Sequence, residues 1–263
     1  MHTSDPEQYA RWLTARLAEC LGDALVAACL HGSAALGGWM AERSDVDVLF
    51  VAADDIGASA VSTTGDLLIS SAASCPGRGL ECSMVTAGQA AQPGSPWPFV
   101  LHLGSDAYHA GGPRLYLGAE RHGDPDLLMH YAVCREAGIS LAGPPPREVI
   151  GPVDRLAILG YLADELRWGL AHAPECYAVL NACRALVFLT EGQILSKVAG
   201  GTAALERGLG PRRLLRGALD QQQGKTHERP PGRAASSFVR QVRQQLAAAA
   251  VQEGQERSQS HGG

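Results

Sequence analysis

The stretch of sequence that decides the fold is residues 30–52, LHGSAALGGWMAERSDVDVLFVA. An apolar run at 24–30 stops abruptly at Gly32 and Ser33, and a small-residue segment and a polar turn follow. A second apolar run begins within the triplet Asp-Val-Asp at 45–47. Apolar runs of this length, bounded by turn residues, are typical of buried strands. The stretch therefore predicts two strands of an α/β domain, with polar residues where the first ends and the second begins.

Asp45 and Asp47 have a spacing that brings two carboxylates together. In an extended strand, residues two apart point to the same face, so both side chains project side by side. Two carboxylates this close repel each other and raise each other's pKa unless a cation lies between them. A hard cation such as Mg²⁺ takes oxygen ligands and usually keeps waters and substrate phosphates in its other positions. The pair is therefore a candidate magnesium site.

Gly32 and Ser33 supply the features of a phosphate site. A glycine lets the backbone approach a phosphate closely, and the serine hydroxyl and the following amides can donate hydrogen bonds to it. Taken alone, a Gly-Ser is commonly a loop, and an Asp-x-Asp is commonly a solvated turn. Here the Gly-Ser ends an apolar strand, where α/β sheets place their ligand sites, and the Asp pair directly precedes the apolar run VLFVA. The combination favours a functional site.

The chain changes character near residue 124. Before it, apolar runs alternate with helical periodicity, which predicts a helix at 6–20 and a third strand at 80–85. After it, helical periodicity dominates, and the Gly-Pro-Pro-Pro run at 143–146 is typical of a linker. We expect an N-terminal domain at 1–142, an all-helical domain at 147–251 and a disordered tail at 252–263.

These motifs carry a resemblance to a known family. The spacing G-S-x(11)-D-x-D after a strand resembles the signature of the DNA polymerase β-type nucleotidyltransferases. The wider order is HGSAALGGWMAERSDVDVLFVA, then LECSMV, then the PW of SPWPF, then DLLMHYAVCREAGISLAGPPP. It is similar to the streptomycin/spectinomycin adenylyltransferases, the aminoglycoside-resistance branch. The resemblance covers most of residues 25–200. It implies an α+β fold, in which a polymerase β-like domain with a mixed sheet flanked by helices precedes an all-helical domain.

The resemblance also implies a reaction and assigns roles in it. A substrate hydroxyl would attack the α-phosphate of ATP, so that AMP is transferred and pyrophosphate leaves. Asp45 and Asp47 would hold the Mg²⁺ that clamps the triphosphate. Glu81, in LECSMV, matches the general base, although without the family it could be an outward-facing strand residue. Ser33 and Ser44 match positions that contact the nucleotide phosphates.

Two cations in the helical half also match family positions. Arg184, in LNACRALVFLTEG, and Lys197, in ILSKVAG, align with residues that grip the triphosphate. The alternative is that both are surface charges without a function. A guanidinium among apolar residues nevertheless needs an anionic partner if it is buried.

The acceptor side departs from the family pattern. Streptomycin-binding members have a tryptophan after the PW motif, where this chain has LHLGSDAYHAGG with Tyr108 as the candidate substitute. They also have an aspartate that reads substrate amino groups, where this chain has the segment PECY at 174–177 with the candidates Glu175 and Tyr177. A site without that carboxylate need not bind the same drugs. The acceptor by resemblance is an aminoglycoside, giving resistance or self-resistance. The alternative is another sugar-bearing natural product, such as an aminoribosyl nucleoside antibiotic.

Composition limits the partners and the compartment. The chain has 263 residues and a net charge of −5, which argues against a nucleic-acid partner because phosphate binding needs a basic surface. No segment approaches the ~20 apolar residues of a membrane span, and the N-terminus lacks the apolar core of a signal peptide. Seven scattered cysteines form no C-x-x-C pair, as expected of a cytoplasmic protein. A non-catalytic, nucleotide-binding regulatory module is a further alternative.

Overall fold

Two separate sets of packing contacts organise the chain. A computed structural model describes residues 3–104 and 112–260. The chain divides into an N-terminal unit, Met1–Val153, and a C-terminal unit, Asp154–Gly263. The division lies about ten residues beyond the predicted end of the first domain at residue 142. Within the described residues, no helix combines the length and the apolar character that crossing a membrane requires.

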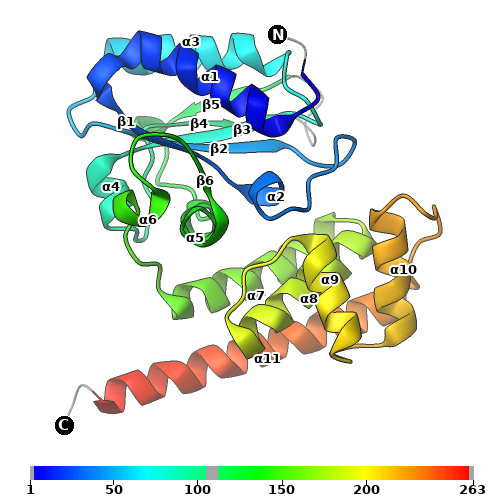
Figure 1. The fold of residues 1–263 in the computed structure, drawn as a ribbon. Coiled ribbons are helices and arrows are strands. Elements are labelled where there is room, and N and C mark those ends of the chain that lie inside the picture. Colours follow the sequence, from blue (N-terminus) through cyan, green and yellow to red (C-terminus); the bar gives the residue numbers. More distant parts are fainter. Residues whose placement is uncertain (1–2, 105–111, 261–263) are drawn as a thin grey trace. The chain divides into compact units, whose positions relative to one another are not determined.

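Hydrogen bonds between the apolar runs build a mixed sheet in the N-terminal unit (Figure 1). Its strands among the described residues are β1 (Leu25–Leu30), β2 (Val46–Ala52), β3 (Leu80–Thr86), β4 (Leu101–Gly104), β5 (Arg114–Leu117) and β6 (Ile139–Ala142). The strand order is β5-β4-β3-β2-β1-β6, and β2 and β3 are parallel while the other neighbours are antiparallel. The predicted mixed sheet is therefore confirmed, and β5 and β6 extend it at its two edges.

Alternation along the strands gives the sheet two apolar faces. On β2, Val48 and Phe50 pack in one cluster with α1 (Pro6–Leu21) and α3 (Ala58–Ala72). Leu49, between them, packs in a second cluster with α5 (Leu127–Ala137). Figure 1 shows α1 and α3 on one side of the sheet, and α5 on the other side together with α4 (Ala87–Ala91) and α6 (Pro146–Val149). We call the second side the α5 face.

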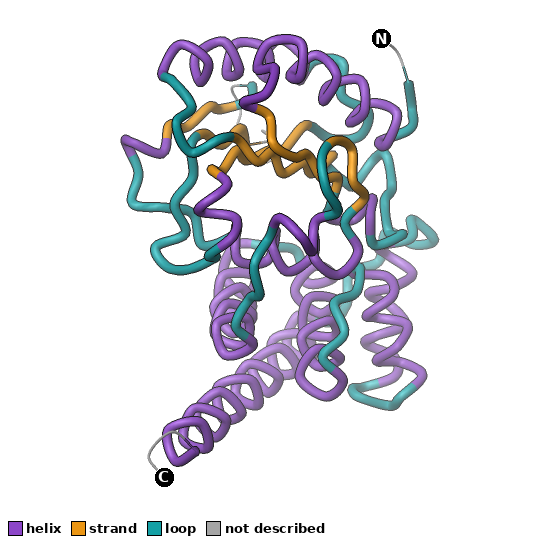
Figure 2. The backbone as a smooth tube through the Cα atoms, turned by 60° about the vertical axis from the view of Figure 1, so that its left-hand side comes forward, coloured by secondary structure: helices purple, strands orange, loops and turns teal. Residues whose placement is uncertain are grey.

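The C-terminal unit contains helices alone among its described residues (Figure 2). They are α7 (Arg155–His172), α8 (Glu175–Glu191), α9 (Lys197–Glu206), α10 (Arg212–Gln222) and α11 (Gly232–Ser260). Helix α8 contacts all four of the others, and most of its length from Cys176 to Phe188 is buried. Burial on every side explains why its sequence is apolar almost throughout.

The last helix extends into the predicted tail. Helix α11 continues to Ser260, so residues 252–260 are helical here although the sequence predicts disorder. Glu253 lies 3.2 Å from the Nε atom of Arg155, which also donates hydrogen bonds to carbonyl groups of α8. Arg257 lies 2.6 Å from the carboxylate of Asp154. Charged side chains thus bind the end of α11 to the start of α7, which hydrophobic patterning does not reveal.

Two glycines allow α9 to pack closely on its neighbours. A Cβ atom at Gly200 would lie 2.7 Å from Cγ and 3.1 Å from Cα of Arg184 on α8. A Cβ atom at Gly201 would lie 2.6 Å from a methyl group of Leu180. Glycine weakens a helix, so two in succession within α9 indicate that close packing outweighs their low helical propensity.

We expect Gly200→Ala to lower the free energy of unfolding by about 1–3 kcal/mol, because the added methyl group must displace the backbone of α8. The matched control is Gly217→Ala in α10, where a Cβ atom meets nothing within 4 Å. That substitution should raise stability by about 1 kcal/mol through helical propensity. Urea unfolding followed by circular dichroism measures both. Equal shifts in the two variants would contradict the close packing.

Candidate active site

Asp47 and Glu81 are direct neighbours on adjacent strands. The parallel register of β2 and β3 pairs Asp47 with Glu81. Both side chains lie on the α5 face, because Leu49 and Val85, each an even number of residues away, pack in the α5 cluster. Asp45 comes immediately before β2, two residues from Asp47. The structure therefore brings together the two strands that carry the predicted metal pair and the predicted base.

Gly32 fits against the carboxylate of Asp47. Its φ angle is +61°, and a Cβ atom at this position would overlap the carboxylate of Asp47. The amide of His31 donates a hydrogen bond of 2.9 Å to the carbonyl oxygen of Asp47, which fixes the two segments together. A side chain at Gly32 would both strain the backbone and displace the carboxylate. The Gly-Ser turn is thus built around Asp47.

The Ser33 hydroxyl is a buried polar group at the candidate site. It lies in the short helix α2 (Gly32–Ala35), and its buried oxygen has no hydrogen-bond partner among the described residues. Buried hydroxyls are normally paired, so an unpaired one at a candidate site suggests a ligand that supplies the missing partner. A phosphate oxygen next to the amides of α2 would do so.

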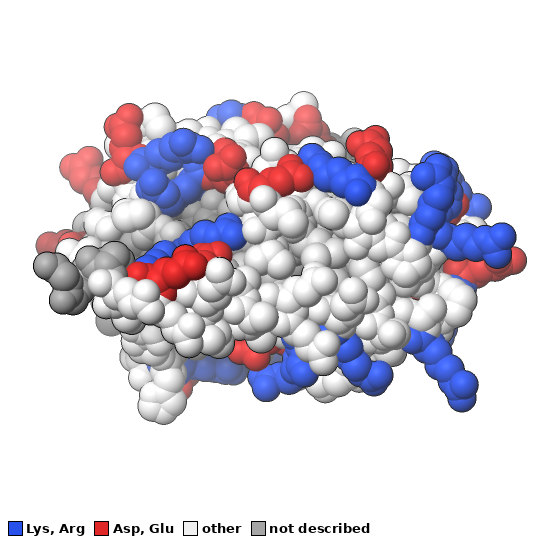
Figure 3. All heavy atoms as spheres, turned by 90° about the horizontal axis from the view of Figure 1, so that it is seen from below, with Lys and Arg blue, Asp and Glu red and all other residues white. Residues whose placement is uncertain are grey.

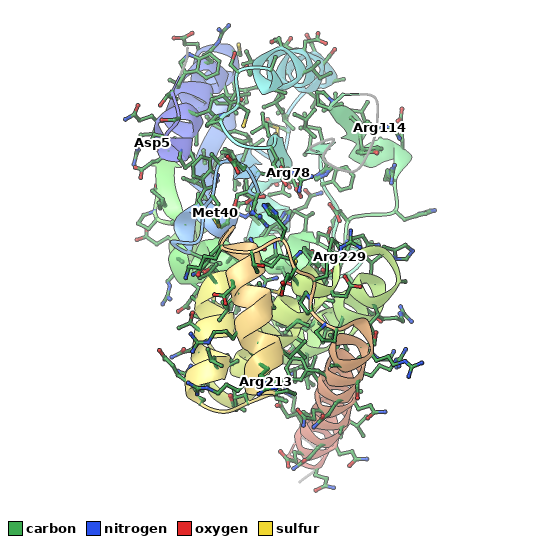
Figure 4. All side chains as sticks on the ribbon, turned by 90° about the vertical axis from the view of Figure 1, so that its right-hand side faces the viewer. Asp5, Met40, Arg78, Arg114, Arg213 and Arg229 are labelled. Atoms are coloured by element: carbon green, nitrogen blue, oxygen red, sulfur yellow. The ribbon has the colours of Figure 1, made fainter. Side chains whose placement is uncertain are left out.

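Ser44 has a structural contact in the turn before Asp45. Its side-chain oxygen accepts a hydrogen bond of 3.1 Å from the amide of Met40, and its carbonyl oxygen accepts one of 3.0 Å from the amide of Arg78. Figure 4 labels Met40, in the same loop as Ser44, and Arg78, in the loop before β3 that the second bond joins to it. Ser44 thereby fixes the turn that leads into Asp45, and its hydroxyl hydrogen can still donate to a phosphate group.

Negative charge accumulates around Glu81. Its pKa is raised well above the ordinary value by burial, and further by Asp47, Asp45, Asp126 and Asp124. A cation that binds nearby would stabilise the ionised form of a carboxylate in such surroundings. The site as it stands therefore favours positive charge.

The donors fit a magnesium ion that the substrate helps to hold. Among the described residues, no group of three or more His, Cys, Asp and Glu side chains is arranged to hold a metal ion. Asp45 and Asp47 offer two carboxylates, and Mg²⁺ commonly binds to one or two carboxylates plus substrate phosphates and waters. The unpaired hydroxyl of Ser33 can donate a hydrogen bond to one of those phosphates. The residues present are thus suited to a metal–triphosphate complex.

Histidines also lie near Glu81, and no local sequence pattern singles them out as a group. His130 on α5 has Nε2 at 3.8 Å from Oε1 of Glu81, and its ring lies 4.7 Å from that of His31. His102 on β4 has Nδ1 at 2.9 Å from the hydroxyl oxygen of Ser83. The available signal is periodicity: His31 continues the alternation of residues 27 and 29, which pack on the α5 face.

A second cluster of predicted residues lies in the C-terminal unit. The hydroxyl of Tyr177 donates to Glu165 at 2.9 Å, and the amide nitrogen of Asn181 donates to the same oxygen at 3.2 Å. Arg184 donates to the amide oxygen of Asn181 at 2.6 Å, and Nζ of Lys197 lies 4.7 Å from the centre of the Tyr177 ring. Arg184 is therefore linked to a carboxylate through Asn181. Burial, followed by the charge of Glu165, raises the pKa of Tyr177.

The other two residues predicted to contact the acceptor are Glu175 and Tyr108. Glu175 is the first residue of α8, is partly buried, and follows Pro174 in the N-cap position. Tyr108 lies outside the described residues. The structure thus gathers Tyr177, Arg184 and Lys197 in one unit, and the carboxylates with the Gly-Ser turn in the other.

Comparison with known proteins relates the C-terminal unit to a family model and the fold to a solved structure. Residues 149–248 match the model of the aminoglycoside adenylyltransferase C-terminal domain. The structure is similar to that of the spectinomycin adenyltransferase AAD(9) from Enterococcus faecialis, which was solved with ATP and spectinomycin. The TM-score is 0.67 and the sequence identity is 15%, over 89% of this chain and 97% of that chain. No curated protein sequence matches this chain. The predicted fold and the resemblance to the adenylyltransferases are confirmed.

Proposed function

We propose that this chain, an aminoglycoside adenylyltransferase-like nucleotidyltransferase, transfers AMP from ATP to a hydroxyl group of a small-molecule antibiotic. The observation that carries the proposal is the pairing of Asp47 with Glu81 beside the Gly32–Ser33 turn. A metal-binding carboxylate and a candidate base are then within reach of the same phosphate and the same hydroxyl. The family match of the C-terminal unit supports the same reaction.

The residues divide the chemistry between them. Glu81 takes the proton of the acceptor hydroxyl as its oxygen forms a bond to the α-phosphorus and the bond to the pyrophosphate group breaks. Asp45 and Asp47 hold Mg²⁺, which supplies positive charge to the triphosphate when it is bound. Ser33 and the amides of α2 donate hydrogen bonds to phosphate oxygens. Gly32 keeps the backbone close enough for that contact, and Ser44 shapes the turn and adds a hydroxyl donor.

Cations of the C-terminal unit are proposed to bind the nucleotide as well. Arg184 is held by Asn181, so its remaining N–H groups keep a fixed direction. Lys197 lies at the first position of α9, over the ring of Tyr177. Both positions fit the binding of phosphate oxygens, which take charge-assisted hydrogen bonds from such groups.

The electrostatics favour an acceptor with amino groups. Four aspartates raise the pKa of Glu81, so a cationic substrate would be attracted to this site and would stabilise the ionised form of the base. An aminoglycoside meets this condition, and so does an aminoribosyl nucleoside antibiotic. The net charge of −5 argues against a nucleic-acid acceptor, and the face drawn in Figure 3 carries both signs of charge.

A mass-spectrometric screen tests the proposal. The protein is incubated with Mg²⁺, ATP and a panel of hydroxyl-bearing antibiotics, and AMP adducts and pyrophosphate are measured. We expect an adduct on at least one amino-bearing acceptor, no product with EDTA, and a loss of at least about 100-fold in Asp47→Asn. Other nucleoside triphosphates, tested in parallel, establish the donor. Calorimetric binding of Mg-ATP without any product across the panel would instead indicate a non-catalytic nucleotide-binding module.

A further inference from the structure

His130 lies against Glu81 and has no role in the transfer as described so far. Its Nε2 atom is 3.8 Å from Oε1 of Glu81, while its buried Nδ1 atom has no hydrogen-bond partner among the described residues. Its ring packs on that of His31, which is only 2% exposed. The side chain is thus confined, with one nitrogen facing the candidate base and the other shielded from solvent.

The surroundings favour one tautomer of His130. Burial lowers its pKa below the ordinary value against the opposing effect of Asp124 and Asp126, so the ring is neutral at pH 7. A proton on Nδ1 would be a buried donor without an acceptor, and the lone pair of Nε2 would face the oxygens of Glu81. A proton on Nε2 avoids both penalties and directs a donor at Oε1.

We propose that His130 is a positioning residue whose Nε2–H holds one carboxylate oxygen of Glu81 and so directs the other oxygen at the acceptor hydroxyl. The inference rests on the proposed transfer reaction. A separation of 3.8 Å is longer than a hydrogen bond, and catalytic contacts of this kind commonly shorten when substrates bind. The charged and titratable groups around the ring are Glu81 on β3, His31 after β1, His102 on β4, and Asp124 and Asp126 before α5.

Two isosteric substitutions test the positioning role. Glutamine places an amide nitrogen near the position of Nε2, whereas asparagine places one near Nδ1. We expect His130→Gln to keep kcat within about threefold of the wild-type value and His130→Asn to lower it by about 10–100-fold, as loss of an orienting partner does. The KM for ATP should change by less than about twofold in both, because Glu81 does not bind the nucleotide. His122→Gln, at an exposed position of the same unit, is the control. Equal kcat values for the Gln and Asn variants, whether high or low, would overturn the proposal.

A second measurement needs no acceptor. In protein labelled with ¹⁵N-histidine, the ring signals that disappear in His130→Gln identify His130, and their nitrogen shifts report the tautomer. We expect the Nε2–H form, and the Nδ1–H form would overturn the inference. This measurement separates two failures. A wild-type protein that modifies no acceptor contradicts the proposed function, whereas a wrong tautomer contradicts the role of His130 alone.

Discussion

Gly32→Ala is expected to lower AMP transfer by at least about 100-fold, the effect of a misplacement of about 1 Å at a reacting centre. The physical reason is the direct contact between Gly32 and Asp47. A methyl group at residue 32 would overlap the Asp47 carboxylate, which must then turn away from the position in which it would hold Mg²⁺. Steady-state kinetics with the acceptor found in the screen measures the loss, and calorimetry with Mg-ATP measures the accompanying loss of metal-dependent binding.

Gly37 offers a matched control in the same segment between β1 and β2. Its φ angle is +66°, close to the +61° of Gly32, but a Cβ atom there meets nothing within 4 Å. Gly37→Ala therefore carries the same backbone strain, about 1–2 kcal/mol, without displacing a carboxylate. We expect its kcat to remain within about twofold of the wild-type value. If both variants lose activity equally, backbone strain rather than the position of Asp47 is responsible.

Glu81→Gln should abolish transfer and at the same time stabilise the protein. Without a base, we expect kcat to fall by about 10²–10⁴-fold. The removal of one negative charge from a partly buried group of five carboxylates relieves repulsion. In metal-free buffer at pH 7 we therefore expect the melting temperature to rise by about 2–4 °C, which corresponds to about 1 kcal/mol in a chain of this size. Differential scanning calorimetry measures the shift.

The pH dependence of this gain follows from the sign of the pKa shift. The pKa of Glu81 is raised in the folded protein, so ionisation at neutral pH costs more in the folded than in the unfolded state. At pH values below the ordinary pKa of a glutamate, both states are protonated and the cost disappears. The difference between wild type and Glu81→Gln should therefore be largest above the raised pKa of Glu81 and shrink as the pH falls toward 4. Glu19→Gln, at an exposed position on α1, should show no such difference. A Glu81→Gln variant that melts below the wild-type protein at pH 7 would contradict this account.

The sequence predicted the strongly patterned elements well and the edges of the sheet poorly. The helix predicted at 6–20 and the strand at 80–85 differ from α1 and β3 by one residue each. The edge strands β5 and β6 were not predicted, because each contains only four residues, too few for a clear alternation of apolar and polar side chains. Within the predicted helical domain, the start of α9 at Lys197 is hard to find from the sequence, because the pair Gly200–Gly201 weakens the helical pattern of its first turns.

Local spacing in the sequence was enough to predict which carboxylates form the candidate site. Asp45 and Asp47 are two residues apart, so strand geometry alone predicts that their side chains lie on the same face. His31 and His130 are far apart in the sequence, and the stacking of their rings depends on how α5 packs on the sheet. For Arg184, the sequence indicated the need for an anionic partner, but not that Asn181 would link it to Glu165. Contacts that arise from tertiary packing leave no local pattern.

The parallel register of β2 and β3 has a consequence for how the chain avoids misfolding. A shift of one residue between paired strands turns every side chain to the opposite face. For β2 or β3, that shift would bury Asp47 or Glu81 among the apolar side chains beneath α1 and α3, at a cost of several kcal/mol for each ion. The carboxylates that are proposed to bind the metal and to act as the base therefore also favour the native alignment of the two central strands. A sheet with shifted strands is less stable, whether or not a substrate is bound.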